Sequence, residues 1–178
     1  MAGGIRLQSP GEHTRPTTER VKEAIFSILR ERVSGARVLD LYAGTGAMGL
    51  EALSRGAESA VFVESDRAAC RVLRKNIEKT RLTGAAVRAM PVEAFVGRFP
   101  PGGSPFDLIF ADPPYRNRDQ PASDLLESAR LPALLSAGGL LILESRAAAA
   151  HAPTRFWRIA DVRCYGDTTI HFLIPADE

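Results

Sequence analysis

The sequence predicts an α/β fold in which a central, mostly parallel sheet has helices on both faces. Two patterns support this prediction. Short apolar segments typical of buried strands alternate with segments of helical periodicity through most of the 178 residues. Near the end of the chain, two strand-like segments at 155–162 and 168–174 are separated by a short turn, which predicts a closing antiparallel hairpin.

The expected elements follow from hydrophobic spacing along a single domain over 1–178. Residues 1–15 are polar and interrupted by Gly and Pro, so we expect an N-terminal arm. A leading helix over 16–34 follows, and residues 36–178 form the core. The apolar face expected for the leading helix consists of Val21, Ala24, Ile25, Ile28 and Leu29. The other expected strands are 36–42, 60–64, 85–89, 106–111 and 140–144, and the other expected helices are 47–54, 67–80 and 124–135.

Composition excludes several classes of protein. Hydrophobic residues make up 45% and charged residues 25%, as in globular proteins, and no run approaches the roughly 20 apolar residues of a membrane helix. The first residues contain no stretch typical of a signal peptide, so we expect a cytoplasmic protein without membrane contact. The net charge of +2 permits a nucleic-acid partner without requiring one. Two distant cysteines and three scattered histidines predict no metal site.

A glycine-rich turn follows the first strand and predicts a ligand at the carboxyl edge of the sheet. Gly44, Gly46 and Gly49 match the pattern GxGxxG, in which the backbone approaches a ligand closely. Glu64 ends the next strand, where a carboxylate accepts hydrogen bonds from ribose hydroxyls. The pattern alone leaves open NAD, S-adenosylmethionine or a plain turn. Asp40 favours S-adenosylmethionine, because its carboxylate suits an ammonium group and would repel a pyrophosphate.

A second and more specific motif, Asp112-Pro113-Pro114-Tyr115, follows the strand at 106–111. Two prolines stiffen the turn and remove backbone donors. The Asp112 carboxylate and the Pro113 carbonyl are then available to accept the two N–H groups of an exocyclic amine, while Tyr115 stacks on the base. Because such an amine is a poor nucleophile, orientation and charge stabilisation are the catalysis that it needs.

Together these motifs resemble the class I, Rossmann-like methyltransferases that methylate exocyclic amines. The segment from Thr14 to Phe26, the strand Leu39 to Gly46 and the segment Tyr165-Gly166-Asp167 are similar to the RsmD family of 16S rRNA guanine-N2 methyltransferases. The resemblance implies a seven-stranded sheet, S-adenosylmethionine as cofactor, and catalysis by Asp112, Pro113 and Tyr115. It also implies a cofactor site made of Asp40, Tyr42, Ala43, Gly44, Gly46, Glu64, Val92, Glu93 and Asp112.

The expected partner is ribosomal RNA in a partly assembled small subunit, bound by a monomer. Candidate RNA-binding residues are Arg15, Arg20 and Lys22, in the segment that borders the active-site mouth in the RsmD family, and Arg116 and Arg118, which follow the clamp. Alternatives are the same chemistry on adenine N6 or on a protein glutamine, a nicotinamide-dependent oxidoreductase, and a non-catalytic ribosome-assembly factor. The clamp motif has no role in the oxidoreductase, and an intact acid at 112 disfavours the assembly factor.

Overall fold

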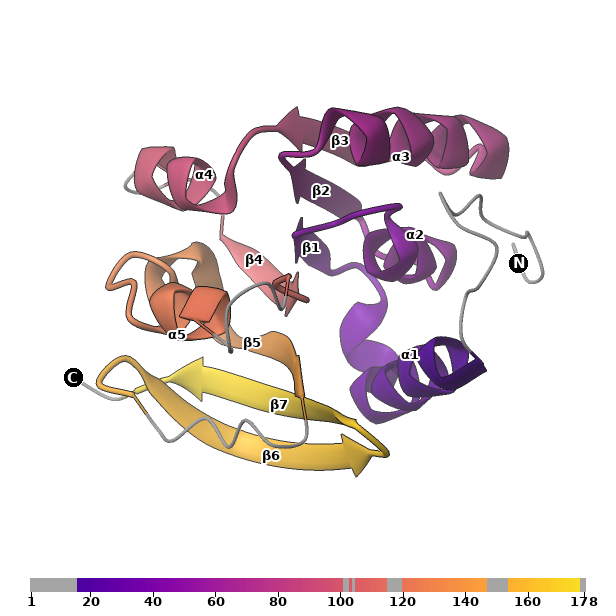
Figure 1. Cartoon of the computed structure of the whole chain (residues 1–178). Helices are drawn as coiled ribbons and strands as arrows, with labels where there is room; N and C mark the ends of the chain where they lie inside the picture. Colours follow the sequence, from indigo (N-terminus) through magenta and orange to yellow (C-terminus); the bar gives the residue numbers. More distant parts are fainter. Residues whose placement is uncertain (1–15, 101–102, 104, 115–119, 147–153, 177–178) are drawn as a thin grey trace.

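Seven strands form one mixed sheet in the order β3-β2-β1-β4-β5-β7-β6 (Figure 1). The computed structural model describes residues 16–100, 103, 105–114, 120–146 and 154–176. Strands β1 to β5 pair in parallel, and β7 pairs antiparallel with both β5 and β6. The predicted α/β sheet and its antiparallel C-terminal hairpin are therefore confirmed.

The elements mostly occupy the ranges that hydrophobic spacing predicts. The strands are β1 (Arg37–Leu41), β2 (Ser59–Glu64), β3 (Ala85–Ala89), β4 (Phe106–Ala111), β5 (Leu135–Arg146), β6 (Trp157–Tyr165) and β7 (Thr168–Pro175). The α-helices are α1 (Pro16–Leu29), α2 (Ala47–Ser54), α3 (Arg67–Thr80), α4 (Val92–Arg98) and α5 (Gln120–Leu126), and short 3-10 helices cover Arg30–Val33 and Pro132–Leu134. None of the helices in the described part of the chain is both long and apolar enough to cross a membrane.

The sheet lies between two layers of helices, with α1, α2 and α3 on one face and α4 and α5 on the other (Figure 1). Two clusters of buried apolar side chains fill the two sides. We call the cluster under α1 to α3 the first core and the cluster under α4 and α5 the second core. Because successive strand residues point to opposite faces, Val38 of β1 belongs to the first core and Leu39 to the second.

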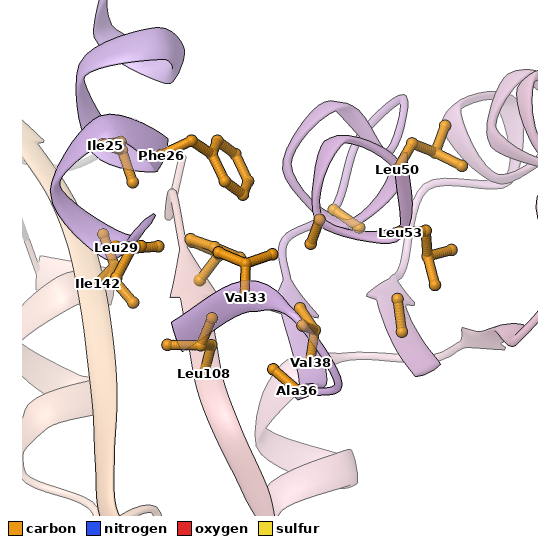
Figure 2. Packing of buried hydrophobic residues seen from close by; sticks show 14 of the residues in the cluster. Ile25, Phe26, Leu29, Val33, Ala36, Val38, Leu50, Leu53, Leu108 and Ile142 are labelled. Atoms are coloured by element: carbon orange, nitrogen blue, oxygen red, sulfur yellow. The ribbon is translucent and has the colours of Figure 1, made fainter. Parts of the chain in front are cut away.

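Helix α1 packs on the first core through a face slightly rotated from the predicted one. Ile25, Leu29 and Phe26 are buried (Figure 2). The centroid of the Phe26 ring lies 5.6 Å from that of Phe110 in β4. Ile28, expected in the core, is 37% exposed. The predicted face omitted Phe26, and burying this larger ring turns Ile28 towards solvent.

Several boundaries differ from the predictions, and the leading helix, expected over 16–34, ends as an α-helix at Leu29 and continues as a 3-10 turn over Arg30–Val33. Helix α5 covers Gln120–Leu126 and not 124–135, and Pro132, which lacks the N–H of a helix interior, begins a separate 3-10 turn in the second half of the predicted range. Strand β5 starts at Leu135, earlier than expected, with a register shift opposite Phe106 and Leu108. Strand β6 continues to Tyr165, and helix α4 had not been predicted, because seven residues are too few to show a helical period clearly.

Candidate functional site

The turn after β1 is built from backbone in the left-handed region. Tyr42 has φ +56°, Gly44 +54° and Gly46 +85°. The Ala43 N–H donates to the Val63 carbonyl of β2 at 3.0 Å, and the Gly46 N–H donates to the Ala43 carbonyl at 2.7 Å. The turn is therefore fixed to its neighbouring strand, and α2 starts directly after it.

The glycines of this turn have different functions. A Cβ atom on Gly46 or Gly49 would overlap Leu73 or Phe62, so these two glycines allow α2 to pack closely on β2 and α3. Among the described residues, a Cβ atom on Gly44 would have only the Tyr42 carbonyl oxygen near it, at 4.0 Å. Gly44 is thus the glycine that leaves open space above the turn, which is the property expected of a ligand-binding position.

Asp40 lies beneath the start of α2 and is 4% exposed. Its Oδ2 accepts the Gly49 N–H at 2.9 Å, so the side chain satisfies one of the donors that a helix leaves free in its first turn. Burial raises the pKa of Asp40 to about 7, against the lowering effect of the Gly49 bond, and the charges of Asp112 and Glu64 raise it further. A cation above the turn would stabilise the ionised form.

Glu64, at the end of β2, holds the same turn from the other side. Its Oε2 accepts the Gly44 N–H at 2.8 Å and its Oε1 accepts the Asp66 N–H at 2.7 Å. A carboxylate oxygen has more than one lone pair, so these bonds orient the group and leave acceptor capacity for a ligand hydroxyl.

Val92 and Glu93, predicted as cofactor-binding residues in the loop after β3, are the first residues of α4, and Glu93 contacts the glycine turn. The Tyr42 hydroxyl donates to Glu93 Oε1 at 3.4 Å, and burial together with the Glu93 charge raises the pKa of Tyr42. Glu93 is exposed, whereas Val92 is buried at the first position of α4. The structure therefore brings Tyr42 and Glu93 together and leaves only the backbone of Val92 as a possible contact for a ligand.

Asp112 and Pro113 directly follow β4 at the same edge. Leu41 of β1 pairs with Ala111, so Asp112 leaves the sheet beside the glycine turn. Asp112 is exposed to solvent at the carboxyl edge of the sheet, yet surrounding protein atoms remove part of its hydration and raise its pKa to about 6. Pro113 is buried. Tyr115, Arg116 and Arg118 lie outside the described residues, as does Arg15.

Two residues that the sequence analysis did not single out also belong to this region. Glu144 of β5 is half-buried, and burial and the charge of Asp112 raise its pKa to about 7. Asn76 of α3 is fully buried, and its Nδ2 donates to the Thr45 carbonyl in the glycine turn at 3.0 Å. Two features of the sequence could have identified them. Glu144 is an acid at the end of an apolar strand, and Asn76 is an amide between Leu73 and Ile77 on the apolar face of a helix.

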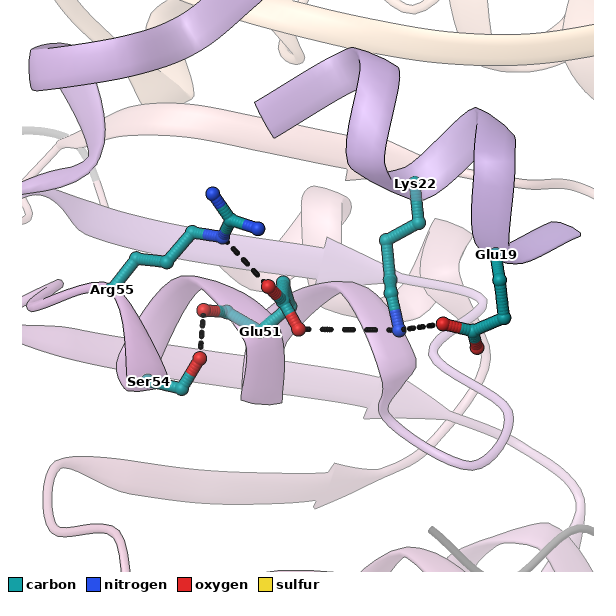
Figure 3. A network of polar contacts seen from close by, with 5 residues as sticks. All are labelled: Glu19, Lys22, Glu51, Ser54 and Arg55. Carbon is teal, nitrogen blue, oxygen red and sulfur yellow. Dashed lines mark hydrogen bonds and ion pairs between the residues drawn. The ribbon is translucent and has the colours of Figure 1, made fainter. Parts of the chain in front are cut away.

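The two described candidates for RNA binding differ in their surroundings. Arg20 is exposed near the start of α1. The Lys22 side chain is only 14% exposed, with its Nζ 2.9 Å from Glu19 Oε2 and 3.9 Å from Glu51 Oε2 of α2 (Figure 3). Glu51 also contacts Arg55, whose guanidinium lies over the Phe26 ring at 4.9 Å. Lys22 therefore joins α1 to α2.

Four carboxylates thus gather along the carboxyl edge, on Glu64, Asp40, Asp112 and Glu144 of β2, β1, β4 and β5. Burial raises the pKa values of Asp40, Asp112 and Glu144, and the charge of Asp112 adds to the shift at Asp40 and at Glu144. Within the described ranges, no group of three or more His, Cys, Asp or Glu side chains has an arrangement that could hold a metal ion. The edge is suited to a cationic organic ligand.

A mostly parallel seven-stranded sheet with a glycine-rich turn after β1 and an antiparallel C-terminal hairpin is the fold of the class I methyltransferases. The chain belongs to the family described as Conserved hypothetical protein 95, which matches residues 2–174. The predicted resemblance to RsmD-type methyltransferases is confirmed by this match and by the relatives below.

Ribosomal RNA small subunit methyltransferase D of Escherichia coli K12 is 42% identical over 108 residues, which cover 61% of this chain and 52% of that protein. The chain therefore matches about half the length of this curated relative. A solved structure of a hypothetical protein from Thermus thermophilus is 36% identical, with a TM-score of 0.80 over 98% of this chain and 95% of that one. An S-adenosylmethionine-dependent methyltransferase from Agrobacterium tumefaciens shares the fold, with a TM-score of 0.61 at 22% identity over 79% of this chain and 47% of that one.

Proposed function

We propose that this protein transfers the methyl group of S-adenosylmethionine to the exocyclic N2 amine of a guanine in small-subunit ribosomal RNA. The observation that carries the proposal is the position of Asp112, which extends from β4 beside the glycine turn at an edge rich in acids. The names of the relatives support rRNA as the substrate, and the resemblance to the RsmD family supports the guanine N2 atom.

The residues present fit S-adenosylmethionine. The cofactor carries a sulfonium and an ammonium group, and it supplies an electrophilic methyl carbon. Asp40 and Asp112 place negative charge where such a cation is stabilised, and Gly44 leaves open space above the turn. Glu64, already oriented by two backbone N–H groups, would accept ribose hydroxyls, and Tyr42 and Glu93, which contact each other, would lie beside the adenine.

Asp112 and Pro113 act on the substrate amine. The Asp112 carboxylate and the Pro113 carbonyl accept its two N–H groups, which directs the nitrogen lone pair towards the methyl carbon. Transfer of the methyl group from the sulfonium to the amine would leave positive charge on the amine, which the Asp112 carboxylate would stabilise. Asp112 or water then accepts the proton that the methylated amine loses. Tyr115 is proposed to stack on the base.

We further propose that exposed Arg20, with Arg15, Arg116 and Arg118, contacts RNA phosphates. Helix α1 leads through the 3-10 turn to the amino end of β1, so its own first turn points back towards the carboxyl edge. Lys22 is better explained by its ion pairs with Glu19 and Glu51. We place the reaction in the cytoplasm, on a partly assembled small subunit, with the enzyme as a monomer.

The nicotinamide-dependent alternative is disfavoured by Asp40. A dinucleotide places its pyrophosphate on the free N–H groups at the start of the helix after the glycine turn. Here the Gly49 N–H is already bonded to a buried carboxylate, which adds negative charge at the place where the pyrophosphate would lie. The Asp-Pro-Pro turn also has no function in hydride transfer.

The test is a labelled-methyl transfer assay with purified protein. S-adenosylmethionine is offered with small ribosomal subunits that lack the modification and, in parallel, with naked small-subunit rRNA, and the product is digested to nucleosides. We expect label in N2-methylguanosine. Label in N6-methyladenosine would retain the mechanism and overturn the guanine assignment. Cofactor binding without label on either RNA would contradict an RNA substrate and favour a DNA or protein acceptor.

A further inference from the structure

Glu144 lies beside the proposed catalytic acid. Ala111 of β4 pairs with Leu143 of β5, so the next residues along, Asp112 and Glu144, are neighbours at the edge. Phe110 and Ile142, two positions earlier on each strand, both belong to the first core. Because side chains alternate along a strand, Asp112 and Glu144 occupy that same face of the sheet.

The function proposed above gives Glu144 no partner. The side chain is half-buried, and it forms no hydrogen bond or ion pair with another residue in the described part of the chain. Burial and the Asp112 charge raise the pKa of Glu144 to about 7. A half-buried acid beside a second acid costs stability unless a ligand supplies a donor, and such costs concentrate at functional sites.

The strand order indicates which part of the substrate reaches Glu144. Across the edge, the acids stand in the order Glu64 on β2, Asp40 on β1, Asp112 on β4 and Glu144 on β5. The cofactor is assigned to β2 and β1, and the target amine to Asp112. The remainder of the base therefore extends past Asp112, away from the cofactor and towards β5.

In guanine, the atom next to the N2 amine on the Watson–Crick edge is N1, which carries a hydrogen. In adenine, the ring atom next to the N6 amine is an unprotonated N1, which accepts hydrogen bonds. An ionised carboxylate only accepts. It thus matches the guanine edge and repels the adenine edge, and bases taken out of the stack are commonly read along this edge.

We propose that Glu144 accepts the N1–H of the target guanine and thereby selects guanine over bases whose N1 is unprotonated. The proposal rests on the function proposed above. It assigns the two acids different tasks, with Asp112 holding the reacting amine and Glu144 reading the adjacent ring atom.

The test replaces the target guanosine with 2-aminopurine, which keeps the exocyclic amine but has an unprotonated N1. Once the wild-type product locates the methylated nucleotide, both versions of the RNA are methylated at pH 8, where Glu144 is ionised. The wild type should favour guanosine by about 100-fold or more in kcat/KM. In Glu144→Gln this preference should fall at least tenfold, because an amide either accepts N1–H or donates to an unprotonated N1.

Glu58→Gln is the matched control, because Glu58 is an exposed acid at the opposite, amino edge of the sheet. It should keep the wild-type preference and the wild-type melting temperature. Glu144→Gln should keep the wild-type cofactor affinity and melt no lower than the wild type at pH 8, because it removes an ionised acid beside Asp112. An unchanged preference in Glu144→Gln, even with a slower reaction, would overturn the assignment of Glu144 alone. A wild-type enzyme that labels no guanine would overturn the proposed function together with it.

Discussion

Asp40 combines a structural bond with an electrostatic cost. Its bond to the Gly49 N–H holds α2 in place, while burial and the charges of Asp112 and Glu64 oppose its ionisation. The same residue therefore stabilises the turn geometry and prepares the edge for a cation. Its pKa near 7 makes this combination measurable through pH.

Because the folded-state pKa of Asp40 is raised from 3.8 to about 7, the folded protein holds this proton more tightly than the unfolded chain. Stability should thus fall as pH rises from about 4 through about 7. The raised pKa values of Asp112 and Glu144 also make stability fall as pH rises. The Gly49 N–H that donates to the Asp40 carboxylate acts in the opposite direction, because it favours the ionised form of Asp40. The melting temperature of the ligand-free protein should fall by several degrees between pH 5 and pH 8, since 1 kcal/mol shifts it by roughly 2–4 °C in a chain of this size.

Asp40→Asn keeps an acceptor for the Gly49 N–H and removes the ionisation, so its melting temperature should vary less with pH. Saturating S-adenosylmethionine should also flatten the wild-type profile, because a bound cation stabilises the ionised acids. Glu58→Gln, at the opposite edge, should leave the slope unchanged. A profile of equal slope in the wild type and Asp40→Asn would contradict the environment assigned to Asp40.

Gly49 and Gly44 should respond differently to the same substitution. Gly49→Ala directs a methyl group into the Phe62 ring and should lower the free energy of unfolding by about 1–3 kcal/mol. Gly44→Ala meets open space but has φ +54°, so its strain should cost about 1–2 kcal/mol. Its methyl group occupies the space assigned to the cofactor, so cofactor affinity should fall at least tenfold. Denaturant unfolding and calorimetric titration of both variants separate these effects.

At the scale of elements, α1 and α2 are joined by the Lys22, Glu51 and Arg55 contacts above the first core (Figure 3). This contact fixes the position of α1, which carries Arg20, relative to α2. The ion pairs are partly exposed, so their contribution to stability is modest, and their main effect is on the position of α1.

Arg20→Ala and Lys22→Met provide a matched pair on this helix. Arg20→Ala should weaken binding to the RNA substrate and reduce the slope of log affinity against log salt by about 1, with no change in melting temperature. Lys22→Met should lower stability by up to about 1 kcal/mol and leave the salt slope unchanged. Equal salt slopes for the wild type and Arg20→Ala would exclude Arg20 from the RNA contact.

Periodicity predicted the elements best where one pattern dominates. Helices α2 and α3 and strands β3 and β4 have the predicted ranges, because strong apolar runs and clear turn residues bound them. Helices α4 and α5 differ, because seven-residue helices show less than two full turns and Pro132 interrupts the segment after α5. The clarity of the apolar pattern and of the turn residues that bound it therefore determined how accurately the range of each element was predicted.

At the scale of the whole molecule, the sheet determines which acids meet. Sequence motifs identified Asp40 and Asp112 through the adjoining glycine and proline turns, and Glu64 through its place at the end of the strand that follows the glycine turn. Glu144 also ends an apolar strand but has no such motif before it, and the β4–β5 register is what places it beside Asp112. Likewise, the Lys22 ion pair with Glu51 joins residues 29 positions apart, which no local pattern reveals. Motifs thus predicted the turns, whereas strand pairing and helix packing determined their neighbours.

The central claim is that Asp112 acts on the amine at an edge that already holds the cofactor. It is tested most directly by comparing Asp112→Asn with the wild type in single-turnover methyl transfer to the RNA, with cofactor affinity and melting temperature measured on the same samples. We expect the variant to remain folded with a melting temperature at pH 8 no lower than that of the wild type, because the substitution removes an ionised acid whose pKa is raised by burial. It should bind the cofactor within about tenfold of the wild type and transfer methyl at least 100-fold more slowly. Transfer at the wild-type rate by a folded, cofactor-bound Asp112→Asn would contradict the account.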